Sequence, residues 1–224
     1  MPNPSLLLCD SDALVQSFIA NDLRPLQGLT RQFGIQPVIT LEVDMELRWL
    51  GKHKDRFVPQ LDKALKHGIL VKLDQSEFQR HLATAAPGTS WSSYQALGSQ
   101  YYGFVQRGEA YTHAGAVTLG MPALSNDQKA IYVLQAQMLR TAVPTLRAFD
   151  LFVFAHESGI LQINACEDIR SELLKSGEGI PGPFLHASFE NGMRDFPCRL
   201  RQGKASETPP DPANHHDPLV IVPL

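Results

Sequence analysis

A short apolar run near the start of the chain constrains its fold more than any other feature. Residues 5–9 read Ser-Leu-Leu-Leu-Cys and are followed directly by an acid, Asp10. The run does not alternate between apolar and polar residues, and strands of this kind are typically covered on both faces. Parallel sheets with helices on both sides provide that setting. We therefore expect residues 5–9 to form a buried strand of a parallel sheet.

Strand and helix signals then alternate along the chain. Gly68 and Gly120 each end a segment with helical spacing of apolar residues. Strands are expected at residues 36–40, 69–73 and 122–124, and helices at residues 12–19, 41–50, 55–67, 90–107, 109–119 and 128–139. This alternation predicts an α/β fold of three layers, α/β/α, around a central and mainly parallel sheet.

The length of 224 residues allows one large domain, or a domain of about 150 residues with an appendage. We predict a domain over residues 1–160, with a helical insertion around 52–107, and a C-terminal helix and proline-rich extension over 161–224. The chain beyond Lys175 holds 8 of the 16 prolines, so regular helix is not expected there. Within it, residues 203–216 are predicted to be disordered and residues 219–222 to be a candidate edge strand.

The composition limits the classes of function. A hydrophobic content of 43% supports a proper core, and the net charge of −3 argues against a generally basic nucleic-acid-binding surface. An RNA partner would therefore need a local patch. No apolar run is long enough for a membrane helix, and the start of the chain does not resemble a secretory signal. Three widely spaced cysteines favour a reducing cytoplasm.

Acidic residues fall where the expected strands end. Asp10 follows the first strand, Asp127 follows a later one, and Glu46 lies one turn into the helix after the second. Glu109 begins the helix that leads to the strand at 122–124. In open α/β sheets, the segments that follow the carboxyl ends of the strands form the ligand crevice. We therefore expect these four acids to converge on one edge of the sheet.

Carboxylates that converge repel one another and are costly to bury unless a cation lies between them. Oxygen ligands suit hard cations such as Mg²⁺ or Mn²⁺, which also bind substrate phosphates. One or two such ions can activate water and stabilise an in-line phosphoryl displacement. The pattern therefore favours metal-dependent hydrolysis of a phosphodiester.

Four short motifs, taken in order, resemble those of the PIN-domain nucleases, and the resemblance covers roughly residues 5–160. The motifs are Leu6-Leu7-Leu8-Cys9-Asp10-Ser11-Asp12-Ala13-Leu14, then Val38-Ile39-Thr40 with Val43 and Glu46-Leu47, then Gly108-Glu109-Ala110 with Ala114 and Ala116, and Leu124-Ser125-Asn126-Asp127. The resemblance implies a PIN-like fold and an endoribonuclease that uses Mg²⁺ or Mn²⁺. Its implied metal ligands, which are also the catalytic residues, are Asp10, Glu46, Glu109 and Asp127.

Some assignments remain open at the level of the sequence. Asp12 and Glu42 are possible additional acids, and either Glu42 or Glu46 can be the ligand because both lie on one helix face. Glu46 fits the family better. Each acid also has a structural interpretation as a helix cap or a first-turn charge. Candidate RNA-binding residues are Ser125, Asn126, Lys129, Arg48 and Lys52, although the cations among them can equally be solvated.

The resemblance implies an RNA substrate, and PIN-domain proteins are frequently the toxins of toxin–antitoxin pairs. An antitoxin protein and a homodimer are therefore expected partners, with a separate role in RNA processing as an alternative. Two other functions remain open. One is a PIN-like module that binds RNA or protein without cutting. The other is a receiver-like signalling domain, which needs a phosphoacceptor aspartate at the end of a central strand and a later lysine.

Overall fold

A parallel sheet forms the centre of the molecule. The computed structural model describes residues 5–49, 54–127, 132–133 and 145–200. Within them, five strands pair in the order β3-β2-β1-β4-β5, and every pairing is parallel. The strands are β1 (Ser5–Cys9), β2 (Ile35–Thr40), β3 (Val71–Leu73), β4 (Ala123–Leu124) and β5 (Thr145–Leu146). The predicted α/β fold with a parallel sheet is confirmed.

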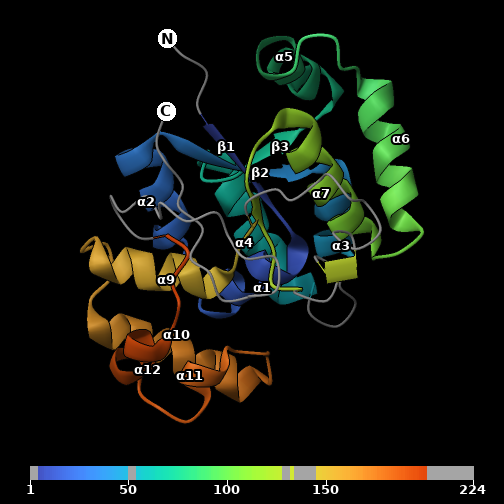
Figure 1. Ribbon diagram of the computed structural model, residues 1–224. Helices are drawn as coiled ribbons and strands as arrows, with labels where there is room; N and C mark the ends of the chain where they lie inside the picture. The colour runs from blue at the N-terminus through green and yellow to red at the C-terminus, as the bar shows by residue number, and fades with distance from the viewer. Residues whose placement is uncertain (1–4, 50–53, 128–131, 134–144, 201–224) are drawn as a thin grey trace.

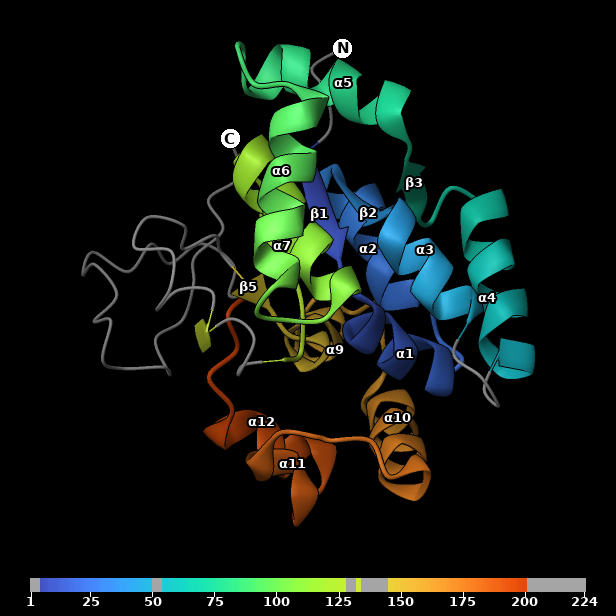
Figure 2. The same cartoon turned by 90° about the vertical axis from the view of Figure 1, so that its right-hand side faces the viewer.

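The first strand lies in the middle of the sheet, as its apolar run predicts. Leu6 and Leu8 belong to one core cluster, whereas Leu7 and Cys9 belong to another on the opposite face. All four side chains are buried. Because side chains alternate along a strand, a run with no polar positions needs cover on both sides. The sequence of β1 therefore requires the three layers that Figures 1 and 2 show.

Helices cover both faces of the sheet (Figure 2). The face of Leu6 and Leu8 is covered by α5 (Gln75–Ala85), α6 (Trp91–Tyr102) and α7 (Arg107–Leu119). The face of Leu7 is covered by a larger group, which comprises α1 (Ser11–Ile19), α2 (Arg24–Phe33), α3 (Leu41–Arg48), α4 (Lys54–Lys66), α9 (Ala148–Glu157) and α10 (Ile163–Ser176). The three-layer prediction is confirmed.

Most of the predicted elements are present. The strands expected at residues 36–40, 69–73 and 122–124 correspond to β2, β3 and β4, and five of the expected helices correspond to α1, α3, α4, α6 and α7. Of the helix expected at residues 128–139, only residues 132–133 are described, and they are helical. The disorder expected at 203–216 and the strand expected at 219–222 lie outside the described residues. The helices α2, α5 and α9 and the strand β5 were not expected from the sequence.

The prediction that no helix follows Lys175 was wrong. Two short helices, α11 (Gly182–Leu185) and α12 (Phe189–Asp195), are present. A proline in the first turn of a helix costs no intrahelical hydrogen bond, and Pro183 has this position in α11. Phe184 and Phe189 are fully buried against the same core as α9, and this burial favours the compact conformation.

The C-terminal segment of the described chain shares its core with the sheet. Cys166 and Leu173 of α10, together with Phe184, Phe189 and Phe196, belong to the cluster that contains Leu7. The division at residue 160 between a domain and an extension remains a prediction. Among the described helices, none combines the length and the apolar character that crossing a bilayer requires.

The strand order brings the segments that follow β1, β2 and β4 together at the carboxyl edge of the sheet. β1 has β2 on one side and β4 on the other, so residues after Cys9, Thr40 and Leu124 emerge next to one another. This order differs from the 2-1-3-4-5 order of the flavodoxin-like sheets, to which receiver-type signalling domains belong. The topology therefore does not support the receiver-like alternative.

Candidate metal centre

The cluster is centred on Asp10, the residue that follows β1. Its side chain has no exposed surface and caps α1, since its Oδ1 accepts a hydrogen bond of 2.8 Å from the backbone N–H of Ser11. The Ser125 hydroxyl donates to the other oxygen, Oδ2, over 3.5 Å. The pKa of Asp10 is raised well above its usual value, first by burial and then by the charges of Asp12 and Glu46.

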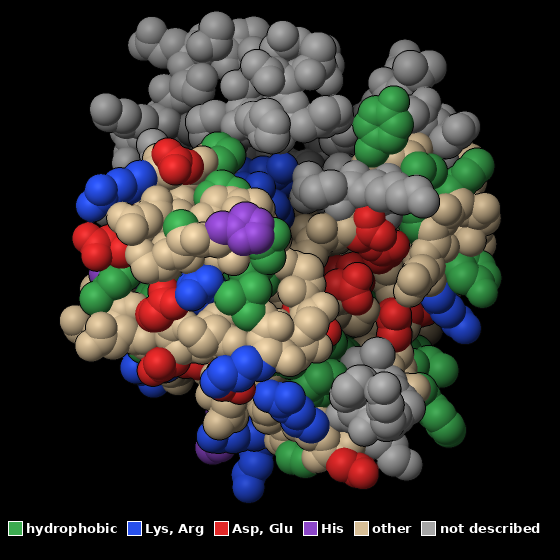
Figure 3. Space-filling view, turned by 90° about the horizontal axis from the view of Figure 1, so that it is seen from below, with side chains coloured by type: hydrophobic (Ala, Val, Ile, Leu, Met, Phe, Trp, Pro, Cys, Tyr) green, Lys and Arg blue, Asp and Glu red, His purple; other side chains and the backbone are tan. Residues whose placement is uncertain are grey.

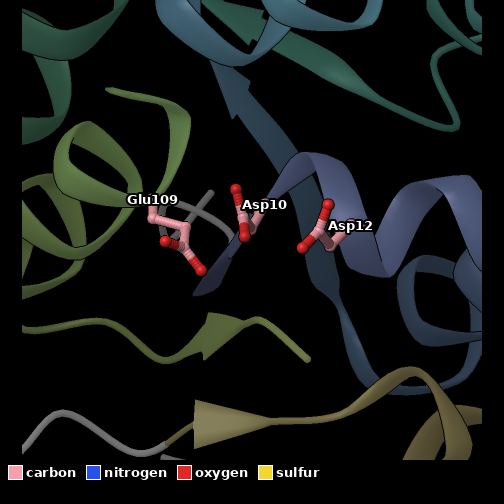
Figure 4. Close-up of side chains that lie close together, drawn as sticks. All are labelled: Asp10, Asp12 and Glu109. Carbon is pink, nitrogen blue, oxygen red and sulfur yellow. The ribbon is translucent and has the colours of Figure 1, made fainter. Parts of the chain in front are cut away.

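Asp12 and Glu109 bring their carboxylates to Asp10. One oxygen from each of these three residues lies within 4.8 Å of the other two, and Figure 4 shows Glu109 approaching from α7 while both aspartates belong to the start of α1. Asp12 is the exposed member, whereas Asp10 and Glu109 are buried. The group therefore opens to solvent on the side of Asp12.

Glu109 is a buried acid that also lacks, within the described part of the chain, a hydrogen-bond partner for one of its oxygens. It lies in the first turn of α7 with 5% of its surface exposed, and its Oε1 has no hydrogen-bond partner among the described residues. Burial raises the pKa of Glu109 to about 9, and the charges of Asp10, Asp127 and Asp12 add to this effect. A carboxylate in this setting is protonated at neutral pH or else requires a cation.

Of the two candidate glutamates on α3, the structure places Glu46 beside Asp10. Burial raises the pKa of Glu46, although its interactions with the Ser11 side chain and the backbone N–H of Gly108 act in the opposite direction. A Cβ atom at position 108 would overlap Oε2 of Glu46, so the glycine permits the close approach of α7 to α3. Glu42 is buried in another direction and accepts a hydrogen bond from the Tyr94 hydroxyl over 3.5 Å.

Asp127 lies at the rim of the cluster. It follows β4 and is partly buried, and its backbone N–H donates to the Ser125 hydroxyl over 3.3 Å. Its carboxylate interacts with Glu109 through a hydrogen bond and with Asp12 through charge. It does not belong to the group of three whose oxygens lie within 4.8 Å of one another.

The candidate RNA-binding residues have different surroundings. Arg48 forms ion pairs with Asp44 and Asp62, at 3.0 and 2.9 Å. Asn126 links the start of α1 to the start of α9, because its amide donates to the Asp12 carbonyl and accepts from the Ala148 N–H. Ser125 is buried, and Lys52 and Lys129 lie outside the described residues.

Sequence reasoning missed His113, which lies near the cluster. Its side chain is 4% exposed, and burial lowers its pKa to about 4 despite the opposing charge of Asp127. The signal was present in the sequence: His113 follows Glu109 by four residues, so the two share one face of a helix.

The cluster contains no built-in countercharge within the described residues. The ion pairs found there involve other acids, and none includes Asp10, Asp12, Glu46 or Glu109. The carboxyl end of β1 points downward in Figure 1. Acidic side chains gather on the face of the molecule seen from that side (Figure 3). A buried carboxylate cluster of this kind can bind a metal ion.

Comparisons with protein-family models, with curated proteins and with solved structures gave no match to this chain. The site is therefore defined by its own geometry: a parallel sheet with a carboxylate group at the carboxyl end of its central strand.

Proposed function

We propose that this chain is a divalent-metal-dependent endoribonuclease of the PIN-domain kind, which hydrolyses RNA phosphodiester bonds with Mg²⁺ or Mn²⁺. The observation that carries the proposal is the approach of Asp10, Asp12 and Glu109 oxygens to within 4.8 Å in a setting without a paired lysine or arginine among the described residues. The order of the parallel strands supports it, because it brings the acids of the four sequence motifs to one edge.

The residues have distinct roles in this proposal. Asp10, Asp12 and Glu109 hold the cation, while Glu46 and Asp127 extend the negative field around it and orient ligands of the ion. Ser11 and Ser125 fix the carboxylate of Asp10 through their hydrogen bonds. A divalent cation in such a site lowers the pKa of water and neutralises charge on phosphate oxygens.

The choice of acids refines the interpretation of the sequence motifs. The sequence motifs made Asp12 only a possible additional acid, whereas in this proposal it is one of the three ligands. Asp127, which the motifs implied as a ligand, is assigned a place at the rim of the site. Oxygen ligands on short aspartate side chains at a helix start are suited to a small, hard cation that keeps several waters. Those waters and an open side at Asp12 leave room for a phosphate.

The test is RNA cleavage by the full chain after treatment with EDTA and return of Mn²⁺ or Mg²⁺. Labelled single-stranded RNA is expected to be cut with the ion and to remain intact without it. Asp10→Asn is expected to abolish cutting while the protein still folds, because asparagine is as good a helix cap as aspartate. RNA binding without cutting, unchanged by the ion, would instead favour a non-catalytic module.

Asp74 offers a matched control. It follows β3 and caps α5 through a 2.9 Å hydrogen bond from the Glu77 N–H, as Asp10 follows β1 and caps α1. Asp74→Asn therefore repeats the local change away from the cluster and is expected to leave cleavage unchanged. If both variants lost activity, the loss would reflect helix capping rather than metal binding.

The partners remain part of the proposal. A toxin of this kind would be held inactive by an antitoxin protein, and it would work as a homodimer. Expression of the chain alone is then expected to arrest growth, and Asp10→Asn is expected to relieve the arrest. A chain that processes RNA without such a partner would cut in vitro but leave growth unaffected.

A further inference from the structure

His113 approaches the acidic cluster from the interior of the molecule. It lies on α7 one helical turn after Glu109, and residues four apart leave the same face of a helix. The ring is almost completely buried, and its Nε2 has no hydrogen-bond partner among the described residues. A buried polar nitrogen without a partner is unfavourable, so Nε2 is available for a further hydrogen bond to a neighbouring acceptor.

Asp127 is the charged group that acts on His113. The electrostatic interaction of the ring is with this carboxylate, and the same carboxylate interacts with Glu109 and Asp12. Asp127 therefore interacts both with the histidine and with two members of the central group of acids. A neutral imidazole can always offer one N–H donor, and a carboxylate is the acceptor that matches it.

His113 does not belong to the central group itself. The described side-chain atoms that meet within 4.8 Å come from Asp10, Asp12 and Glu109, and a histidine nitrogen is not among them. Carboxylates around a metal are commonly held by a further hydrogen bond from behind, which fixes their direction. The position of His113 suits that task better than direct coordination.

We propose that His113 is a positioning residue, whose Nε2–H donates to Asp127 and fixes that carboxylate toward a divalent cation held by Asp10, Asp12 and Glu109. The inference rests on the proposed function, since it requires a cation at this site. It adds a residue that the sequence motifs do not include, and it gives Asp127 a defined role at the rim of the cluster.

The test compares Mn²⁺ affinity between variants of the full chain, measured by titration calorimetry after removal of metal with EDTA. His113→Leu fills the space without a donor and is expected to weaken Mn²⁺ binding by about 10–100-fold. His113→Gln places an amide N–H near the position of Nε2 and is expected to restore most of that loss. If His113 had only a structural role, the N–H donor of His113→Gln would not restore the Mn²⁺ affinity.

Thr118→Val is the matched control on the same helix. The Thr118 hydroxyl donates to the Ala114 carbonyl over 2.6 Å, so its removal alters α7 two turns beyond Glu109. Its affinity for Mn²⁺ is expected to equal that of the wild type. If His113→Leu does not fold, His113→Asn is compared with His113→Gln, because the shorter amide cannot reach Asp127 and is expected to bind more weakly.

The outcomes separate this inference from the proposed function. The role of His113 would be overturned if the wild type, His113→Gln and His113→Leu (or His113→Asn in its place) bound Mn²⁺ with equal affinity. The cation site itself would not be affected by that result. A strong nitrogen coupling to bound Mn²⁺ in pulsed electron paramagnetic resonance, lost on substitution of His113, would also overturn this role by showing direct coordination. A wild-type protein that binds no Mn²⁺ would refute the cation site and the inference together.

Discussion

Two fully buried aspartates in this molecule have opposite surroundings. Asp150, in the first turn of α9, accepts hydrogen bonds from the backbone N–H and the guanidinium of Arg147 at 2.8–3.1 Å and from the Arg199 N–H at 2.8 Å. Asp10 accepts from the Ser11 N–H and the Ser125 hydroxyl, and its charged neighbours are other acids. Arg147 neutralises the carboxylate of Asp150, whereas the carboxylate of Asp10 has no ion pair with a described residue.

Buried acids that the chain pairs with its own cations can be distinguished by their partners from those that it leaves unpaired. Asp150 joins α9 to the C-terminal segment, because its partner Arg147 also lies 4.2 Å from the ring of Phe196 and donates to the Pro197 carbonyl. Asp44, another buried acid, is paired with Arg48 and Lys72. The chain pairs these acids with its own cations, whereas the Asp10 cluster has no paired cation among the described residues and can bind a metal ion.

The largest expected effect comes from breaking the neutralised pair. Asp150→Asn leaves the half-buried Arg147 without its countercharge, and removal of one partner from a buried ion pair costs about 3–5 kcal/mol. Urea denaturation is expected to show this loss in the free energy of unfolding. Glu172→Gln, which removes an exposed ion pair with Lys175, should leave the midpoint unchanged. An Asp150→Asn protein as stable as the wild type would contradict the comparison.

Adding the missing countercharge to the Asp10 cluster is expected to stabilise the protein. At a Mn²⁺ concentration of 100 times Kd, binding to the folded state contributes about 2.7 kcal/mol. For a chain of this size, that gain raises Tm by roughly 5–10 °C in a thermal unfolding experiment. The shift should vanish in Asp10→Asn and persist in Asp74→Asn. The same shift in all three proteins would place the ion elsewhere.

The metal-free protein is expected to lose stability as the pH rises. The pKa of Glu109 is about 9 in the folded chain and 4.5 without the fold, so the folded state binds more protons between these values. The contribution of this group to stability is highest below pH 4.5 and falls by about 1.4 kcal/mol per pH unit toward pH 9. Denaturation in EDTA at several pH values measures the slope.

Glu109→Gln sharpens this pH experiment. A neutral side chain of the same shape removes both the proton uptake and the repulsion from Asp10. The variant is expected to have a flatter pH dependence than the wild type and, in EDTA at pH 8, a higher stability. A lower stability at pH 8 would show that Glu109 is held by favourable contacts rather than strained by its neighbours.

The smallest effect is expected at the contact between α3 and α7. Gly108→Ala places a methyl group where Oε2 of Glu46 now lies. The end of the glutamate side chain can move, so overall stability should change by less than about 1 kcal/mol. Mn²⁺ affinity is expected to fall several-fold, as calorimetry can show. Gly179→Ala, at a position with open space around its Cα, is the matched control.

Much of the fold follows from local sequence patterns. The uninterrupted apolar residues of β1 predict a central buried strand, and glycines at positions 68 and 120 mark helix ends where the backbone has positive φ. The strand β5 has two residues and leaves too short a pattern to detect. The helices α11 and α12 depend on contacts with Phe149, which is remote in sequence.

The candidate site could be predicted only in part. Acids after strand ends are visible in the sequence, and parallel pairing brings them to one edge. Which carboxylate oxygens meet is decided by side-chain directions: Glu42 turns toward Tyr94, Glu46 lies against Gly108, and Asp12 reaches Glu109. The electrostatic interaction of His113 with Asp127 links α7 to the segment after β4, so no local sequence pattern encodes it.

Asp10 satisfies two demands with one short side chain. It gives α1 its first hydrogen bond, and it carries the charge at the centre of the acidic group. Asparagine would meet the first demand only, and the longer glutamate would carry the charge but fit the helix start poorly. Position 10 therefore tolerates few substitutions. The backbone N–H of Ser11 requires a short acceptor, the acidic group that includes Glu109 requires a carboxylate, and aspartate meets both requirements.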